Sequence, residues 1–273
     1  MVTNMGDIEK ELQDLRYLDW SRSRKSSGTA GSFLKSYDDT GKKKKYYKLS
    51  DYDPVKGIVG HECVNEIVVQ RLLQLLKIDH LEYRLIHAVV RIDDRDCETY
   101  LCESEDYKTE GEGKIALDDY YLMEREIGES PYVFCARKGW EKYISDMLLV
   151  DYLILNRDRH GANIEVLRNE KKHSVRLAPL FDHGLSLLCR CRTIEEIKSF
   201  DVMEDKKVQA FVGSPSTFEN ISMLSKSYLK GLPNLRKKDL DVLFEGLDDV
   251  LRSEHIVKIR EMIWRRWCSL GSI

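Results

Sequence analysis

The feature that most constrains the fold of this chain is a polar, charged loop directly after an almost wholly apolar helix. Residues 140–155 are apolar nearly all round, which predicts a central buried helix. The next residues read Asn-Arg-Asp-Arg-His-Gly-Ala-Asn (156–163), and a predicted β-ribbon over 164–177 then leads to Phe-Asp-His-Gly (181–184). Ordinary turn residues could make a polar loop here, but this placement is hard to explain by packing alone. We therefore expect the polar side chains to converge in one cleft.

Three oxygen-bearing side chains in these two segments suit phosphoryl transfer. Asp158 and Asn163 are five residues apart, and Asp182 follows after the ribbon. In phosphoryl transfer one carboxylate accepts the proton of the attacking hydroxyl, while an Asn and a second Asp hold magnesium against the phosphates. We predict Asp158 as the catalytic base and Asn163 and Asp182 as Mg2+ ligands. His160 is predicted to brace the loop or to contact the γ-phosphate of ATP.

A Ser- and Gly-rich stretch near the amino terminus offers backbone N–H groups and hydroxyls that could hold phosphates. The predicted cofactor-binding residues in this stretch are Ser27, Gly28, Thr29, Gly31 and Ser32. Alone the signal is weak, since such a stretch is more often a flexible linker. Its position before a predicted strand favours a phosphate-binding loop.

Lys48 is the predicted nucleotide lysine. It lies on a predicted strand, residues 45–49, which returns from a hairpin turn at residues 38–41. A lysine on a strand facing the nucleotide supplies a positive charge to the α- and β-phosphates. The alternative is an exposed strand lysine, and Lys44 and Lys45 are weaker candidates for the same role.

The predicted nucleotide lysine needs a helix glutamate to hold it. Residues 61–77 carry their apolar side chains on one face, which predicts a helix. Glu62 and Glu66 lie about one turn apart on that helix, so either could serve. Glu66 is preferred because it lies beside the apolar face at Ile67.

The order of predicted elements indicates an α+β, two-lobed fold rather than a doubly wound sheet, in which strands and helices would alternate throughout. Residues 7–18 are predicted to form a short amphipathic helix within an amino-terminal helical extension, residues 1–19. Residues 20–108 would make a small β-rich N-lobe, with paired strands near 83–92 and 99–103. A polar stretch, residues 104–114, would join it to a mostly helical C-lobe, residues 109–273.

Composition narrows the function classes. The net charge of −3 gives no bias toward nucleic acid or an anionic membrane, and no apolar run approaches the roughly 20 residues that cross a bilayer. The polar amino terminus lacks the apolar core of a signal peptide, so a cytoplasmic protein is expected. The seven cysteines are scattered and complete no four-ligand zinc set, which favours reduced thiols.

At this point the sequence resembles a known family. Asp-Arg-His-Gly-Ala-Asn-Ile followed by Phe-Asp-His-Gly is similar to the motifs shared by HipA-like protein kinases and the phosphoinositide lipid kinases. The segments GTAGSFLK, YYKLSDYD, GHECVNEIVVQRLL and TYLCESEDY more closely resemble the short, CtkA-like members of the HipA group. The resemblance covers residues 20–190 in ordered motifs, while the tail agrees only in general character.

The resemblance implies a two-lobed, protein-kinase-like fold and a serine/threonine protein kinase that uses Mg-ATP and can phosphorylate itself. Carried over by position, Asp158 matches the base, Asn163 and Asp182 the metal ligands, and Lys48 the nucleotide lysine. Residues 27–32 match the phosphate-binding loop. Residues 102–107 match the hinge that meets adenine, which adds Cys102 and Glu103 to the cofactor-binding residues.

Two departures limit what the resemblance implies. HipA itself carries an amino-terminal subdomain that helps engage a DNA-binding antitoxin, and the Ser/Gly-rich stretch here begins already near residue 21, so the resemblance gives little support for an antitoxin-type partner. The metal motif reads Asp-His-Gly where eukaryotic-type kinases have Asp-Phe-Gly, so their Phe-gated inactive state does not carry over.

HipA-like kinases can silence themselves by phosphorylating a serine of the phosphate loop. Ser26, Ser27, Thr29 and Ser32 lie in the equivalent stretch, which predicts self-phosphorylation there; alternatively these hydroxyls only bond to the loop backbone.

Two other functions stay open: a phosphoinositide-type lipid kinase, and a catalytically inactive nucleotide-binding module that acts as an interaction partner. The expected partner is a protein substrate of unknown identity, with no direct role for nucleic acid or membrane.

Overall fold

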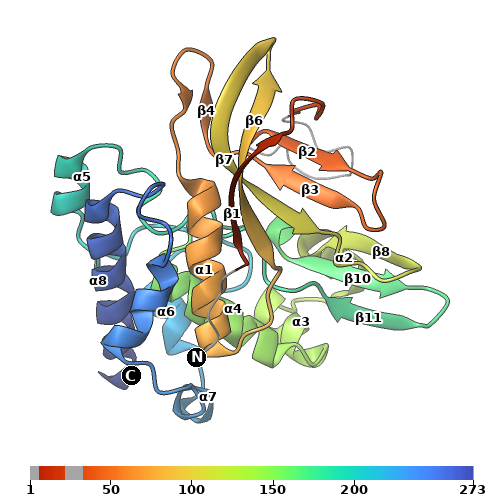
Figure 1. Ribbon diagram of the computed structural model, residues 1–273. Coiled ribbons are helices and arrows are strands. Elements are labelled where there is room, and N and C mark those ends of the chain that lie inside the picture. Colours follow the sequence, from red (N-terminus) through yellow and green to blue (C-terminus); the bar gives the residue numbers. More distant parts are fainter. Residues whose placement is uncertain (1–5, 22–32, 273) are drawn as a thin grey trace.

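The computed structural model describes residues 6–21 and 33–272. A five-stranded sheet with the strand order β1-β6-β7-β3-β2 packs against the long helix α1 (Glu62–Leu76), and helices α5, α6 and α8 lie on the far side of α1 from the sheet (Figure 1). β1 runs parallel to β6, and the other pairs are antiparallel. The strands of this sheet are β1 (Ile8–Asp14), β2 (Lys35–Asp38), β3 (Lys45–Lys48), β6 (Tyr83–Ile92) and β7 (Arg95–Glu105).

From residue 112 onward the chain is mostly helical and contains a smaller sheet of order β11-β10-β8, seen to the right in Figure 1. Its strands are β8 (Glu112–Ala116), β10 (Glu165–Asn169) and β11 (Ser174–Leu177). The helices are α2 (Leu117–Glu124), α3 (Pro131–Arg137), α4 (Glu141–Ile154), α5 (Ile194–Ser199), α6 (Thr217–Ser222), α7 (Lys226–Lys230) and α8 (Ser253–Ser269), with 3-10 turns η1 (Gly161–Asn163), η2 (Lys237–Phe244) and η3 (Leu270–Ser272).

Two short strand pairs complete the described elements. β4 (Tyr52–Asp53) and β5 (Gly57–Ile58) make a small hairpin before α1. β9 (Asp158–Arg159) runs parallel to β12 (Gln209–Ala210), so the loop after α4 is held by backbone pairing to a segment fifty residues later in the chain. None of the helices in the described ranges is both long and apolar enough to cross a membrane.

The alternation of side chains along the large sheet directs Lys48 toward α1. Lys48 lies opposite Cys102, which in turn lies opposite Leu85, and both neighbours belong to the main core around α1. The adjacent residues Tyr47 and Leu101 point to the other face, where they belong to a second apolar cluster. A strand that begins half-buried thus places Lys48, its last residue, in the interior.

Helix α4 is the buried helix that the sequence predicts. Nearly all of its residues from Ile144 to Ile154 are buried, and it ends at Leu155, which adopts a left-handed backbone conformation with φ of 51°. The chain then turns sharply and the polar loop begins. The predicted hairpin at residues 38–41, the helix over 61–77 and the ribbon over 164–177 are likewise confirmed.

The prediction of a helix over residues 7–18 is wrong. Residues 8–14 form β1, which pairs with the edge of β6. The spacing of Ile8, Leu12, Leu15 and Leu18 is compatible with a helix, but Leu12 is half exposed, whereas Leu15 and Leu18 fill the second apolar cluster. The open edge of β6 supplies backbone hydrogen bonds that a short isolated helix could not match.

Helix α1 is anchored to the helical half as well as to the sheet. The buried Arg71 donates two hydrogen bonds of 2.8 Å to the carboxylate of Asp7, just before β1, and Nη1 also donates to the carbonyl oxygens of Leu243 (3.2 Å) and Glu245 (2.8 Å). One guanidinium therefore joins β1, α1 and the end of η2.

The start of α1 packs against α8 through two histidines. The rings of His61 and His255 lie 4.5 Å apart between centroids. Burial, together with the neighbouring His255, lowers the pKa of His61 to about 3. Burial also lowers the pKa of His255. Both rings are therefore neutral in the folded protein at neutral pH.

This pair predicts an acid-sensitive fold. In the unfolded chain His61 takes up a proton near pH 6.5, whereas in the folded chain its pKa is depressed. Protonation below pH 6.5 therefore stabilises the unfolded chain only. The free energy of unfolding is highest above pH 6.5 and decreases as the pH falls. Between pH 7 and pH 5 we expect His61 to remove about 2 kcal/mol from the free energy of unfolding. Urea unfolding of the wild type and of His61→Asn at pH 7, 6 and 5 measures this.

The loss of stability on acidification should be shallower in His61→Asn than in the wild type. His173→Asn, at an exposed turn, should leave it unchanged. Equal slopes in the wild type and His61→Asn would contradict the assignment.

Candidate active site

The side chain of Lys48 lies between two carboxylates from distant parts of the chain. Its Nζ lies 3.1 Å from Oε1 of Glu66 on α1 and 2.5 Å from Oδ1 of Asp182. Lys48 and Glu66 are buried, and the side chain of Asp182 retains 19% of its exposure. The phenyl ring of Phe33 is 5.1 Å from the same nitrogen. The structure therefore brings the predicted nucleotide lysine, the preferred glutamate and one predicted metal ligand together.

Charge pairing keeps Lys48 positive in spite of its burial. Burial alone lowers the pKa of this lysine, but the carboxylates of Asp182 and Glu66 outweigh it and raise the pKa well above its usual value. Tyr83 lies beside the group: its hydroxyl accepts a hydrogen bond of 3.3 Å from the backbone N–H of Asp182. Burial, with the charge of Glu66, raises the pKa of Tyr83 well above its usual value. At neutral pH the tyrosine is thus neutral and the lysine charged.

Glu66 also fixes the segment that carries Asp182. Its carboxylate accepts hydrogen bonds from the backbone N–H groups of His183 (2.8 Å) and Gly184 (3.0 Å). A side chain at Gly184 would meet Glu62 and Glu66 at 3.1–3.3 Å, so the glycine lets this segment pack closely on α1. Asp182 itself has φ of 58°, an uncommon conformation outside glycine that is often found where function requires it.

The loop after α4 gathers the other predicted residues. Nδ2 of Asn163 donates a hydrogen bond of 2.9 Å to the backbone oxygen of Asp158 and lies 3.5 Å from its Oδ2. Nε2 of His160 lies 3.6 Å from Oδ1 of Asp158. A side chain at Gly161 would come within 2.4 Å of Asp118, so only glycine fits the tight passage between this loop and α2. Asp158, His160 and Asn163 thus share one turn.

Arg159 joins the two halves of the site. Its guanidinium makes two hydrogen bonds of 2.9 Å to Asp151 on α4, and Nη1 donates to the carbonyl oxygens of Phe181 (2.9 Å) and Asn163 (3.2 Å). One buried cation therefore fixes the loop of Asp158 against the segment of Asp182. Burial lowers the pKa of Arg159, but the charge of Asp151 outweighs it and raises the pKa above its usual value.

The predicted metal ligands suit magnesium by their chemistry. The amide nitrogen of Asn163 donates its hydrogen bond to Asp158, so the amide oxygen is the atom that could coordinate a cation. Asp182 offers a carboxylate. In the described ranges no three His, Cys, Asp or Glu side chains cluster to hold a metal. Mg2+ prefers oxygen ligands and is commonly held by one or two protein groups together with phosphate oxygens.

The other predicted cofactor-binding residues take no part in the ion pairs of Lys48 or lie outside the described ranges. Cys102 is buried opposite Lys48, and its thiol donates to the carbonyl oxygen of Cys63 at 3.1 Å. The side chain of Glu103 points to the opposite face of the sheet, where it pairs with Lys45 (3.1 Å) and Arg84 (3.4 Å). The predicted phosphate-binding residues Ser27, Gly28, Thr29, Gly31 and Ser32 lie outside the described residues.

Sequence reasoning missed three residues that hold the site together: Asn65, Tyr83 and Arg159. Nδ2 of Asn65, fully buried on α1, donates hydrogen bonds of 3.0 Å to the carbonyl oxygens of Gly184 and Ser186. Polar residues on otherwise apolar helices were the available signal, because a buried polar group needs a partner. In the same way, the polar residue Asp151 on the apolar helix α4 indicated that a buried partner, here Arg159, must lie beside it.

The fold is similar to that of a solved kinase. The crystal structure of the Helicobacter pylori proinflammatory kinase CtkA matches with a TM-score of 0.63 over 93% of this chain and 93% of that chain, with 14% of residues identical. The chain has a kinase fold. The predicted fold class, an α+β, protein-kinase-like fold of the HipA and phosphoinositide-kinase type, is confirmed by this match to a kinase fold. The sequence matches no family model and none of the curated proteins with which it was compared.

Because Arg159 pairs with Asp151, removing the carboxylate of Asp151 should greatly lower the stability of the fold. Asp151→Ala leaves a buried guanidinium without its counter-charge, which costs about 3–5 kcal/mol in the free energy of unfolding. Asp249→Ala removes the exposed ion pair with Lys10 and should cost less than about 1 kcal/mol. Urea unfolding of both variants checks this, and similar losses in the two would contradict a structural role for Arg159.

Proposed function

We propose that this chain is an ATP-dependent protein kinase that transfers the γ-phosphate to Ser or Thr hydroxyls of a protein substrate. The observation that carries the proposal is the position of Lys48 between Glu66 and Asp182, joined through Arg159 to the turn of Asp158 and Asn163. A charged lysine, a base and two oxygen ligands held in one connected network are the parts that phosphoryl transfer requires. The likeness to the fold of a kinase supports this function.

Each residue has a role in the proposed reaction. Lys48, held by Glu66, contacts the nucleotide phosphates. Asn163 and Asp182 would hold Mg2+, which would neutralise charge on the phosphates. Asp158 accepts the proton of the acceptor hydroxyl, and His160, 3.6 Å from its carboxylate, keeps that carboxylate oriented. With nucleotide and metal present, Lys48 would contact a phosphate and Asp182 would hold the metal, in place of the ion pair that joins them here.

Replacing the proposed base tests the reaction. Asp158→Asn keeps the shape of the turn but cannot accept a proton, so we expect the rate of phosphate transfer to fall by at least about 100-fold. The affinity for Mg-ATP should change little, because Asp158 holds neither the phosphates nor the metal. Radiolabelled ATP with the chain and a mixture of proteins measures transfer, and calorimetry measures binding.

The matched control is Asp119→Asn, at an exposed position on α2, which should keep full activity. Undiminished transfer by Asp158→Asn would refute the role of Asp158. Binding of ATP by the wild type without transfer to any acceptor would favour an inactive nucleotide-binding module.

A lipid acceptor is the alternative that the same assay separates. Phosphoinositide-type lipid kinases resemble this chain in the loop of Asp158 and the segment of Asp182. Phosphatidylinositol vesicles offered beside the protein mixture should receive no label under our proposal. Label in the lipid and none in protein would favour the lipid kinase.

Self-phosphorylation of the Ser/Thr-rich stretch is a further part of the proposal. Residues 21–37 contain hydroxyls next to the predicted phosphate-binding loop. A phosphate there adds a charge of about −1.5 to −2, which repels the phosphates of ATP. Mass spectrometry after incubation with Mg-ATP should find a phosphate on Ser26, Ser27, Thr29 or Ser32 in the wild type. Asp158→Asn should show none, and an unmodified stretch in the wild type would contradict this part.

A further inference from the structure

A pocket of about 520 Å3 opens on the β-rich part of the molecule, and none of its lining residues belongs to the proposed active site. Its apolar lining comes from the face of the large sheet opposite α1 and from the segments beside that face. The apolar residues are Leu18, Trp20, Leu34, Tyr52, Pro54 and Ile92, of which Trp20, Tyr52 and Pro54 are partly or fully exposed and the other three are buried in the second apolar cluster. The volume is within the range of pockets that bind ligands.

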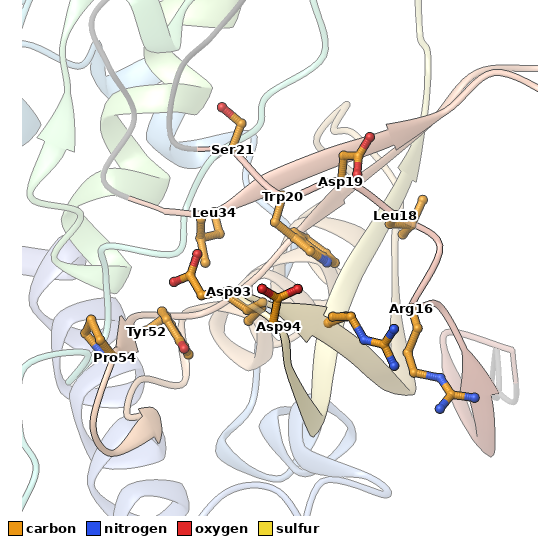
Figure 2. Close-up of a pocket in the computed structure, with 12 residues that line it drawn as sticks. Arg16, Leu18, Asp19, Trp20, Ser21, Leu34, Tyr52, Pro54, Asp93 and Asp94 are labelled. Carbon is orange, nitrogen blue, oxygen red and sulfur yellow. The ribbon is translucent and has the colours of Figure 1, made fainter.

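The edge of this pocket is acidic. Asp93 and Asp94 form the tip of the β6–β7 hairpin, both are exposed, and in Figure 2 their carboxylates are turned toward the same space as the ring of Trp20. Neither carboxylate has an ion-pair or hydrogen-bond partner within the ranges that the structure describes. Asp19 adds a third negative charge to the lining, although Figure 2 shows its carboxylate turned away from the other two.

The basic residues of the lining do not cancel this charge. Arg16 pairs with Asp14 at 2.6 Å and with Asp96 at 3.2 Å. Arg91 pairs with the same Asp96 at 2.7 Å. The two arginines and these two aspartates balance one another. Arg95, next to the tip, donates to the carbonyl oxygen of Pro54 at 3.2 Å. Among the residues that the structure describes, it offsets one of the three remaining negative charges of the lining.

Two partly exposed aromatic rings beside a negatively charged edge fit a ligand that carries both an apolar group and a cation. We propose that this pocket binds a short segment of another protein, in which an apolar or aromatic side chain is flanked by arginine or lysine. The apolar side chain packs against the partly exposed rings of Trp20 and Tyr52, and the flanking cations pair with Asp93 and Asp94. A free polyamine lacks the apolar group, and an uncharged apolar ligand leaves the edge unused.

The proposal does not depend on kinase activity, and its test measures binding alone. Random heptapeptides displayed on phage are selected against the full wild-type chain. We expect the enriched peptides to contain an apolar residue next to Arg or Lys. Their Kd should rise at least tenfold for the double variant Asp93→Asn/Asp94→Asn and should also rise with salt. Asparagine tolerates the left-handed backbone at these positions, where φ is 48° and 61°, so the hairpin tip is preserved.

The matched control is Asp248→Asn/Glu195→Gln, two exposed carboxylates on the helical part, which should leave the Kd unchanged. Binding should also shift the indole N–H resonance of Trp20, assigned with Trp20→Phe, and leave those of Trp140, Trp264 and Trp267 in place. Enriched peptides without cations, equal affinity for the Asp93/Asp94 variant, an unshifted Trp20 signal, or no enrichment at all would overturn the proposal.

Discussion

The burial of one charged lysine organises the centre of this protein. A lysine as deeply buried as Lys48 is costly unless carboxylates neutralise it, and the two that do so come from α1 and from the segment after β11. Because the pairing needs both, it fixes where α1 lies relative to the sheet and where Asp182 lies relative to α1. The other contacts of the site follow from that geometry.

A second buried cation has the corresponding role on the other side of the site. Arg159 ties the turn of Asp158 to α4 through Asp151 and to the segment of Asp182 through the carbonyl oxygen of Phe181. Glu66 and Asn65 on α1 hold the same segment from the opposite direction. The uncommon backbone conformation of Asp182 is thus supported from both sides by contacts of its neighbours, as a strained backbone position requires.

The parts of this site that a sequence can predict are those set by local order. A helix that ends in a polar turn, a ribbon that leads to a second carboxylate, and a lysine followed by a helix with Glu66 all follow from spacing. The contacts of Arg159 with Asp151, and of Asn65 with Gly184, join distant segments, so no local pattern contains them. At the amino-terminal strand β1 a local pattern misleads. The spacing of its apolar residues fits a helix, but backbone pairing with the edge of β6 makes the segment a strand.

The most direct test is a crystal structure of the chain with Mg2+ and a non-hydrolysable ATP analogue. The account predicts that the amide oxygen of Asn163 and the carboxylate of Asp182 coordinate the metal. It also predicts that Nζ of Lys48 moves from Asp182 to a phosphate oxygen while keeping its contact with Glu66. A nucleotide bound elsewhere, or a metal held without Asn163 and Asp182, would contradict it.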